Sequence, residues 1–270
     1  MATYCIYISL DENTLLFLQI DTYTMKKHIP NIITSLNFLC GSVAVLFAVS
    51  GDLITASFFV FAGIFFDFFD GLAARVFNAQ SEVGLQFDSL ADVVTSGLAP
   101  AVVMVQLLSE ATLGHSLIIT DMFAENNWNS GLSSYVPFIG LLIAVASAYR
   151  LAKFNVDTRQ TSSFIGLPTP ANALLVLSLP LILHFQYVEG MEAVILNPWV
   201  LIGMTLLSCV LLNAEIRLFA LKFKTWNVKG NLTRYIFILT CLLAVFLLKF
   251  IAIPVIIAVY ILLSLLPNKQ

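Results

Sequence analysis

Charged residues are scarce in this 270-residue sequence. Asp, Glu, Lys and Arg together make up 11% of it, against roughly 25% in a typical soluble domain. Hydrophobic residues account for 59%, and 22 residues are phenylalanine. No polar stretch is long enough to build a separate core outside a bilayer. The composition therefore excludes an ordinary soluble protein and predicts one helical membrane domain.

Three further absences narrow the class of protein. The net charge is −3 and no dense basic run occurs, which argues against nucleic-acid binding. The four cysteines lack CxxC pairing, so we expect inert packing residues. Residues 1–24 contain no Lys or Arg and so lack the basic start of a secretory signal peptide. We expect residues 1–27 to be an N-terminal extension, either disordered or interfacial.

The apolar segments predict an all-α, polytopic transmembrane bundle. A spanning helix needs about 20 mostly apolar residues. Spans are expected near residues 32–50, 53–75, 89–108, 134–154, 171–188, 197–213, 233–248 and 251–266. The last two form a hairpin, because Lys249 and Pro254 interrupt a stretch too long for one helix. The expected parts are a core over 28–213, a cytoplasmic interfacial segment over 214–232 and the hairpin over 233–270.

The distribution of basic residues predicts the orientation. Cytoplasmic loops of membrane proteins carry the excess of Lys and Arg. With the N-terminus inside and eight spans, all of the 13 Lys and Arg residues except Lys249 fall on the cytoplasmic side. We therefore expect both termini in the cytoplasm.

Four aspartates stand in or beside the apolar segments. Asp67 and Asp70 are three residues apart, and Asp88 and Asp92 are four apart, so each pair shares one helix face. Two antiparallel helices joined by a short link would bring the pairs together near the cytoplasmic surface. Such groups are costly in a membrane and usually functional, and like charges repel without a cation. Oxygen-only ligands predict Mg²⁺, Mn²⁺ or Ca²⁺ rather than zinc.

The spacing around these aspartates resembles the signature of the CDP-alcohol phosphotransferase family. The signature is matched at every fixed position by Asp67, Asp70, Gly71, Ala74, Arg75, Gly84, Asp88 and Asp92. The resemblance implies a six-helix core, usually dimeric, with an active site open to the cytoplasm. It implies two Mg²⁺ or Mn²⁺ ions on Asp67, Asp70 and Asp88, with Asp92 as shared ligand and general base. Ca²⁺ is expected to bind without supporting activity.

The same resemblance assigns the nucleotide side of the site. Together with Asp67, the signature residues Gly71, Ala74, Arg75 and Gly84 are expected to accommodate the cytidine nucleotide. Gly71 and Ala74 would stay small so that the nucleotide can lie against the helix, and Gly84 would let a neighbouring helix approach. Arg75 would add a cation near the phosphates, or alternatively anchor the helix at the membrane surface.

Three other stretches resemble the phosphatidylserine synthase subgroup of that family. They contain Thr34 and Asn37, Ser96, and the pair Arg150 and Lys153, which we expect to bind a serine or phosphate acceptor. Arginine suits a carboxylate because its donors match both oxygens. Helix–helix hydrogen bonding stays open for Thr34 and Asn37, as does positive-inside anchoring for Arg150 and Lys153.

The implied reaction joins CDP-diacylglycerol and L-serine into phosphatidylserine, with release of CMP, in the cytoplasmic membrane and among membrane lipids. Within the family, a phosphatidylglycerophosphate or phosphatidylinositol-phosphate synthase is the alternative, although a phosphate-bearing acceptor would require a denser basic cluster. A divalent-cation transporter would need polar residues at mid-bilayer in several spans. The segments near 171–188 and 233–248 are almost wholly apolar, which argues against transport.

Overall fold

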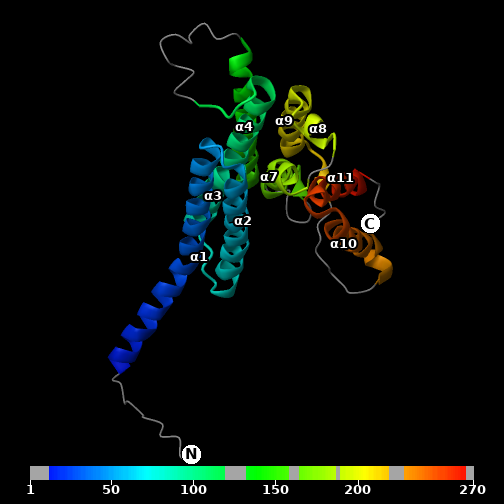
Figure 1. Cartoon of the computed structure of the whole chain (residues 1–270). Coiled ribbons are helices and arrows are strands. Elements are labelled where there is room, and N and C mark those ends of the chain that lie inside the picture. The colour runs from blue at the N-terminus through cyan, green and yellow to red at the C-terminus, as the bar shows by residue number, and fades with distance from the viewer. Residues whose placement is uncertain (1–11, 119–131, 158–163, 187–188, 219–227, 266–270) are drawn as a thin grey trace, which may run out of the picture.

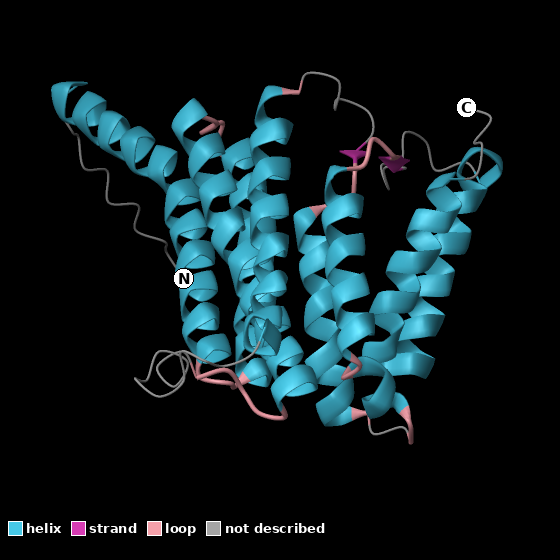
Figure 2. Ribbon diagram, turned by 90° about the horizontal axis from the view of Figure 1, so that it is seen from above, coloured by secondary structure: helices cyan, strands magenta, loops and turns pink. Residues whose placement is uncertain are grey.

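The computed structural model describes residues 12–118, 132–157, 164–186, 189–218 and 228–265. In chain order the elements are α1 Glu12–Val49, α2 Leu53–Val76, α3 Glu82–Asp92, the π-helical η1 Val93–Leu98, α4 Ala99–Leu113, the 3-10 helix η2 Leu132–Leu141, α6 Leu142–Val156, β1 Phe164–Ile165, α7 Thr169–Phe185, α8 Met191–Ile195, α9 Pro198–Asn213, β2 Arg217–Leu218, α10 Val228–Leu248, the 3-10 turn η3 Lys249–Ile251 and α11 Ala252–Leu265. Figure 2 shows most of the longer helices lengthwise.

The helices have the length and apolarity of membrane spans. Five stretches qualify, namely His28–Val49, Leu53–Val76, Glu82–Leu113, Ser133–Val156 and Ile238–Leu265, and the shorter helices α7 and α9 are also apolar. The chain is thus an integral membrane protein, and the predicted all-α fold is confirmed. The described residues add two antiparallel two-residue strands, β1 and β2, which tie residues 164–165 to residues 217–218.

Two helices extend beyond their predicted spans. α1 begins at Glu12 and continues without a break to Val49, so part of the expected N-terminal extension is helical. The third predicted span, 89–108, is the middle of a longer path through α3, η1 and α4. A search for apolar residues underestimates this path because its first turns are polar on one side. Residues 1–11 and 219–227, parts of the predicted extension and interfacial segment, lie outside the described residues.

A tight connection joins α2 to α3. The Asn78 backbone has a φ of 50°, a left-handed conformation that asparagine tolerates better than most residues. Ser81 then caps α3, since its Oγ accepts a hydrogen bond from the Gly84 N–H at 3.0 Å. The turn reverses the chain within a few residues, and α2 and α3 both pack against α1.

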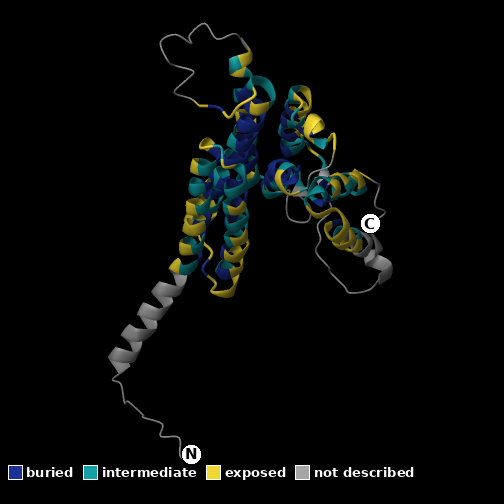
Figure 3. Cartoon of the chain, viewed as in Figure 1, coloured by how far each residue is buried: buried dark blue, intermediate teal, exposed yellow. Residues whose placement is uncertain are grey.

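The path from Glu82 to Leu113 forms the centre of the bundle. Two-thirds of its most apolar window, 67%, is buried, compared with 28% for the α1 and α2 spans. Figure 3 shows the buried residues concentrated along α4. Met104, Leu107 and Leu108 of α4 are almost fully buried against α1, α2, α6, α7 and α9. A polar group on this helix is therefore surrounded by protein and must find a partner or a ligand.

The C-terminal hairpin packs at the side of this core. α10 and α11 contact each other and are separated by η3, where Lys249 has a φ of 47°, so the chain breaks at the predicted place (Figure 1). Gln186 holds the turn: its Nε2 donates to the Leu248 carbonyl at 2.9 Å, and its Oε1 accepts from the Ile251 N–H at 3.1 Å. A small apolar cluster that includes Leu218 and Ile257 joins α11 to the strand region.

Candidate active site

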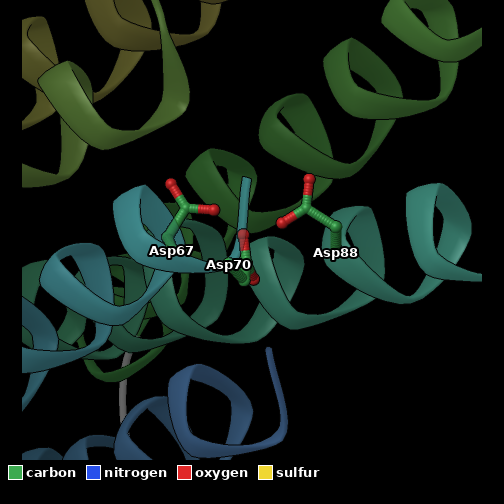
Figure 4. Close-up of side chains that lie close together, drawn as sticks. All are labelled: Asp67, Asp70 and Asp88. Carbon is green, nitrogen blue, oxygen red and sulfur yellow. The ribbon is translucent and has the colours of Figure 1, made fainter. Parts of the chain in front are cut away.

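Three carboxylates from α2 and α3 meet close to α1, which packs against both helices. Asp67 and Asp70 project from α2, and Asp88 projects from α3 (Figure 4). One oxygen from each residue lies within 4.8 Å of the others. The predicted convergence of Asp67, Asp70 and Asp88 is thus present in the fold, and the tight turn between the two helices produces it.

The donor set of this cluster fits a divalent cation. Mg²⁺ and Ca²⁺ lie about 2.0–2.6 Å from their oxygen ligands, so two oxygens on one ion are at most about 4–5 Å apart. The three carboxylates meet that limit. In addition, Asp88 Oδ1 is buried and has no hydrogen-bond partner among the described residues. An ion would satisfy this oxygen and offset the repulsion between the carboxylates.

Side chains of α1 hold two of the aspartates in place. Thr34 Oγ1 donates to Asp70 Oδ2 at 2.7 Å, and Asn37 Nδ2 contacts Asp92 Oδ1 at 3.4 Å. Thr34 and Asn37 are both buried, as are Asp70 and Asp92. From the sequence, Thr34 and Asn37 are predicted either to bind the acceptor or to form hydrogen bonds between helices. Their observed partners give them a positioning role towards the carboxylates, while acceptor binding stays a prediction for both.

Close packing around Thr95 fixes the position of α1 against the centre of the bundle. Thr95 Oγ1 donates to the Asn37 carbonyl at 3.0 Å. A Cβ added at Gly41 would lie 2.7 Å from Thr95 Cα, and one at Gly63 would lie 2.5 Å from Thr95 Cγ2. Glycine at both positions therefore lets η1 sit against α1 and α2. This contact also sets where Asn37 meets Asp92.

The four residues predicted, together with Asp67, to accommodate the nucleotide lie along α2 and α3. A Cβ added at Gly71 would meet only the end of the Arg75 side chain, at 3.9 Å, so this face of α2 is open among the described residues. Ala74 lies one turn further along. Arg75 is exposed and its Nε donates to the Gly71 carbonyl at 2.9 Å. Gly84 faces α1, with 3.2 Å from an added Cβ to Asn31 Oδ1, which agrees with the predicted close helix approach.

The two predicted basic residues lie together at the end of α6. Arg150 is 7% exposed, and its positive charge acts on the Asp92 carboxylate. Lys153 Nζ is 3.7 Å from Glu215 Oε1, and both basic residues line the same pocket. Ser96 lies on η1, fully buried, and its Oγ has no partner in the described part of the chain. A π-helical turn next to Asp92 is notable because such turns occur frequently at functional sites.

Sequence reasoning missed two polar groups near this site. Asn155, at the end of α6, exchanges hydrogen bonds with Ser89 at 2.9–3.2 Å and donates to Gln86 Oε1 at 3.2 Å, which ties α6 to the helix that carries Asp88. Asn213 ends α9 and lines the pocket beside Arg150. An Asn at the end of an otherwise apolar run is the available signal for Asn213, and hydropathy predicts only the end of a span there.

Comparisons with known proteins agree with the signature. The family model described as CDP-alcohol phosphatidyltransferase matches residues 27–211. Three curated relatives carry the name CDP-diacylglycerol–serine O-phosphatidyltransferase. The Bacillus subtilis relative is 35% identical over 165 residues, which cover 60% of this chain and 77% of the relative. The Helicobacter pylori strain 26695 relative is 32% identical over 204 residues, covering 74% and 75%. The Methanocaldococcus jannaschii relative is 27% identical over 169 residues, covering 63% and 68%.

Proposed function

The chain belongs to the CDP-alcohol phosphatidyltransferase family, and from that premise we propose that it is a phosphatidylserine synthase. In this reaction the phosphatidyl group of CDP-diacylglycerol is transferred to the hydroxyl of L-serine, and CMP is released. The names of the relatives in bacteria and in an archaeon support serine as the acceptor.

The convergence of Asp67, Asp70 and Asp88 beside Asp92 is the observation that carries the proposal. The three clustered residues would hold Mg²⁺ or Mn²⁺, with Asp92 as a shared ligand if two ions bind. These carboxylates would hold divalent ions that would neutralise the pyrophosphate and stabilise the charge on departing CMP. The open face of α2 at Gly71 leaves room for a nucleotide beside these carboxylates.

Asp92 acts as the general base. Its carboxylate takes the proton of the serine hydroxyl while the serine oxygen forms a bond to the phosphorus that carries the diacylglycerol. The bond between that phosphorus and the CMP oxygen breaks, and the electron pair leaves with CMP. Asn37 orients Asp92 from α1. None of the eight signature positions is Ser, Cys or His, so a direct displacement is proposed, without a covalent enzyme intermediate.

Arg150 positions the acceptor. It is buried next to Asp92, so a carboxylate bound to its guanidinium would hold the serine hydroxyl near the base. The distribution of Lys and Arg supports a site that opens to the cytoplasm, with both termini on that side of the cytoplasmic membrane. A homodimer is proposed from family membership alone.

The test is CMP release by the purified protein in detergent, with CDP-diacylglycerol and Mn²⁺ or Mg²⁺ present. Serine, glycerol-3-phosphate, inositol-1-phosphate and inositol are each supplied as the sole acceptor. We expect release with serine, and loss of that release on chelation or in Asp92→Asn. Release with only a phosphate-bearing acceptor would overturn serine as the acceptor, and no release with any of them would overturn the transferase function.

A further inference from the structure

A pocket lies on the side of Arg150 that faces the end of α9. Its lining includes Arg150, Lys153 and Phe154 from the last turns of α6, and Leu212 and Asn213 from the end of α9. Ile165 of β1 also contributes to it. Arg150 thus belongs to the pocket and also acts electrostatically on Asp92, the proposed general base.

Two residues of the pocket lining each have one polar atom without a partner. Arg150 Nε and Asn213 Oδ1 are both buried, and neither has a hydrogen-bond partner within the described residues. The other end of the Asn213 amide is fixed, since its Nδ2 donates to the carbonyls of Ala146 and Cys209, each at 3.2 Å. These two bonds orient the amide and leave its oxygen for another group. Buried polar atoms without partners are rare and call for a ligand or water.

A zwitterion matches this arrangement. An α-amino acid carries a carboxylate, which requires N–H donors, and an ammonium group, which requires oxygen acceptors. Arg150 and Lys153 supply the donors. Asn213 supplies a neutral acceptor, and Glu215 brings a negative charge close to the pocket-lining Lys153, with 3.7 Å between Glu215 Oε1 and Lys153 Nζ. An acceptor that bears a phosphate lacks the ammonium group and would meet the charge of Glu215 unfavourably.

We propose that Asn213, assisted by Glu215, binds the ammonium group of the serine acceptor and so selects an amino acid over a sugar phosphate or glycerol phosphate. The inference rests on the proposed function, because it assigns a specificity residue to the same reaction. Both residues lie just beyond residues 27–211, the region that matches the family model. They are specificity and positioning residues, and Asp92 keeps the chemical role.

Asn213→Leu is the direct test. Leucine has a similar volume and no acceptor, so the hydrogen bond to the charged ammonium is lost. The KM for serine should rise by about tenfold or more, the usual effect of losing a hydrogen bond to a charged group. The KM for CDP-diacylglycerol should stay unchanged. Ser208→Ala is the matched control, because Ser208 is buried on the same helix but is absent from the pocket lining, and its kinetics should equal the wild type.

Glu215→Gln tests the same idea without disturbing the core, since the Glu215 side chain is 70% exposed. We expect a smaller rise in the KM for serine, together with stronger inhibition by added glycerol-3-phosphate. Glu110→Gln, an exposed acid at the far end of α4, is its control. If Asn213→Leu does not give a folded, monodisperse protein, the KM for serine of Glu215→Gln and its inhibition by glycerol-3-phosphate test the proposal instead.

The possible failures are distinct. If the wild type releases no CMP with serine, the proposed function is overturned. If the wild type uses serine but both variants keep its KM, or if the KM for CDP-diacylglycerol rises equally, only the role of Asn213 and Glu215 is overturned.

Discussion

The two ends of the helical path from Glu82 to Leu113 differ in whether their buried polar groups have hydrogen-bond partners. At the end near Leu113, Gln106 is fully used: its Nε2 donates to the Val49 carbonyl at 3.1 Å, and its Oε1 accepts from the Leu117 N–H at 2.8 Å. Ser109 likewise donates to the His115 carbonyl at 2.8 Å. These groups close the loop onto the helix end, and the protein itself satisfies them.

The end that carries the aspartates is different. Asp88 Oδ1, Ser96 Oγ, Asn37 Oδ1 and Arg150 Nε are all buried without a partner in the part of the chain that the structure describes. Most buried polar groups in proteins are paired, so a concentration of unpaired ones beside clustered carboxylates marks a place built for ligands. Polar groups near Leu113 stabilise the fold, whereas those near the aspartates are left to bind a ligand.

The largest expected effect comes from the aspartate end. Asp92→Asn should lower kcat for CMP release by about 10²- to 10⁴-fold, the usual contribution of a general base. The fold should be unaffected, because the amide oxygen can still accept from Asn37. Kinetics and thermal unfolding of the same preparation check both statements. A variant that retains full activity would remove Asp92 from the chemistry.

Gly41→Ala should damage the fold and the site together. The new Cβ would lie 2.7 Å from the backbone of Thr95, and overpacking of this kind costs about 1–3 kcal/mol. The measurement is the thermal midpoint in detergent, followed by activity of the folded fraction. Gly203→Ala is the control, since no atom of the described residues lies within 4 Å of its added Cβ. Equal effects in both variants would argue against the Thr95 contact.

Gln106→Leu should lower stability and leave activity unchanged, whereas Asp92→Asn should lower activity and leave stability unchanged. Loss of the amide leaves the Leu117 N–H unpaired and should lower the free energy of unfolding by about 1–2 kcal/mol. The activity per folded molecule should stay at the wild-type value, because Gln106 lies at the other end of the helix from the carboxylates. A change in kcat without a change in stability would contradict the division of roles between the two ends.

The smallest effect is expected at Asp52, which caps α2. The hydrogen bonds from the side chain and backbone N–H of Thr55 lower the pKa of Asp52. Asp52→Ala should therefore cost about 0.5–1 kcal/mol at neutral pH. A lowered pKa means that the contribution is present above the unfolded-state pKa and is lost as the pH falls through the folded-state value. Thermal unfolding of both proteins across acidic pH should show the difference disappearing; a difference that persists would contradict the cap.

Much of the aspartate end could be predicted from sequence. Spacings of three and four residues place Asp67 with Asp70 and Asp88 with Asp92 on single helix faces, and a short link allows few arrangements other than a hairpin. Which side chains would meet the carboxylates could not be predicted. The bond from Thr34 to Asp70 joins residues 36 positions apart and depends on how α1 packs.

The limits of the helices were harder to predict than their existence. Hydropathy detects the apolar part of a helix, so it missed the polar first turns of α1 and α3. The π-helical turn after Asp92, in which Thr95 and Gly97 pack closely against neighbouring helices, has no signal in composition. Asn213 was overlooked because its role appears only when α9 is seen beside Arg150.

The central claim is that the clustered carboxylates Asp67, Asp70 and Asp88 form a divalent-ion site. Its most direct test is thermal unfolding of the purified protein during a Mn²⁺ titration, with the wild type compared with Asp88→Asn. Ligand binding to the native state stabilises it, by about 2.7 kcal/mol at 100 times the Kd. We predict that Mn²⁺ raises the midpoint of the wild type and leaves that of Asp88→Asn nearly unchanged. Equal shifts in both proteins, or no shift in the wild type, would contradict the claim.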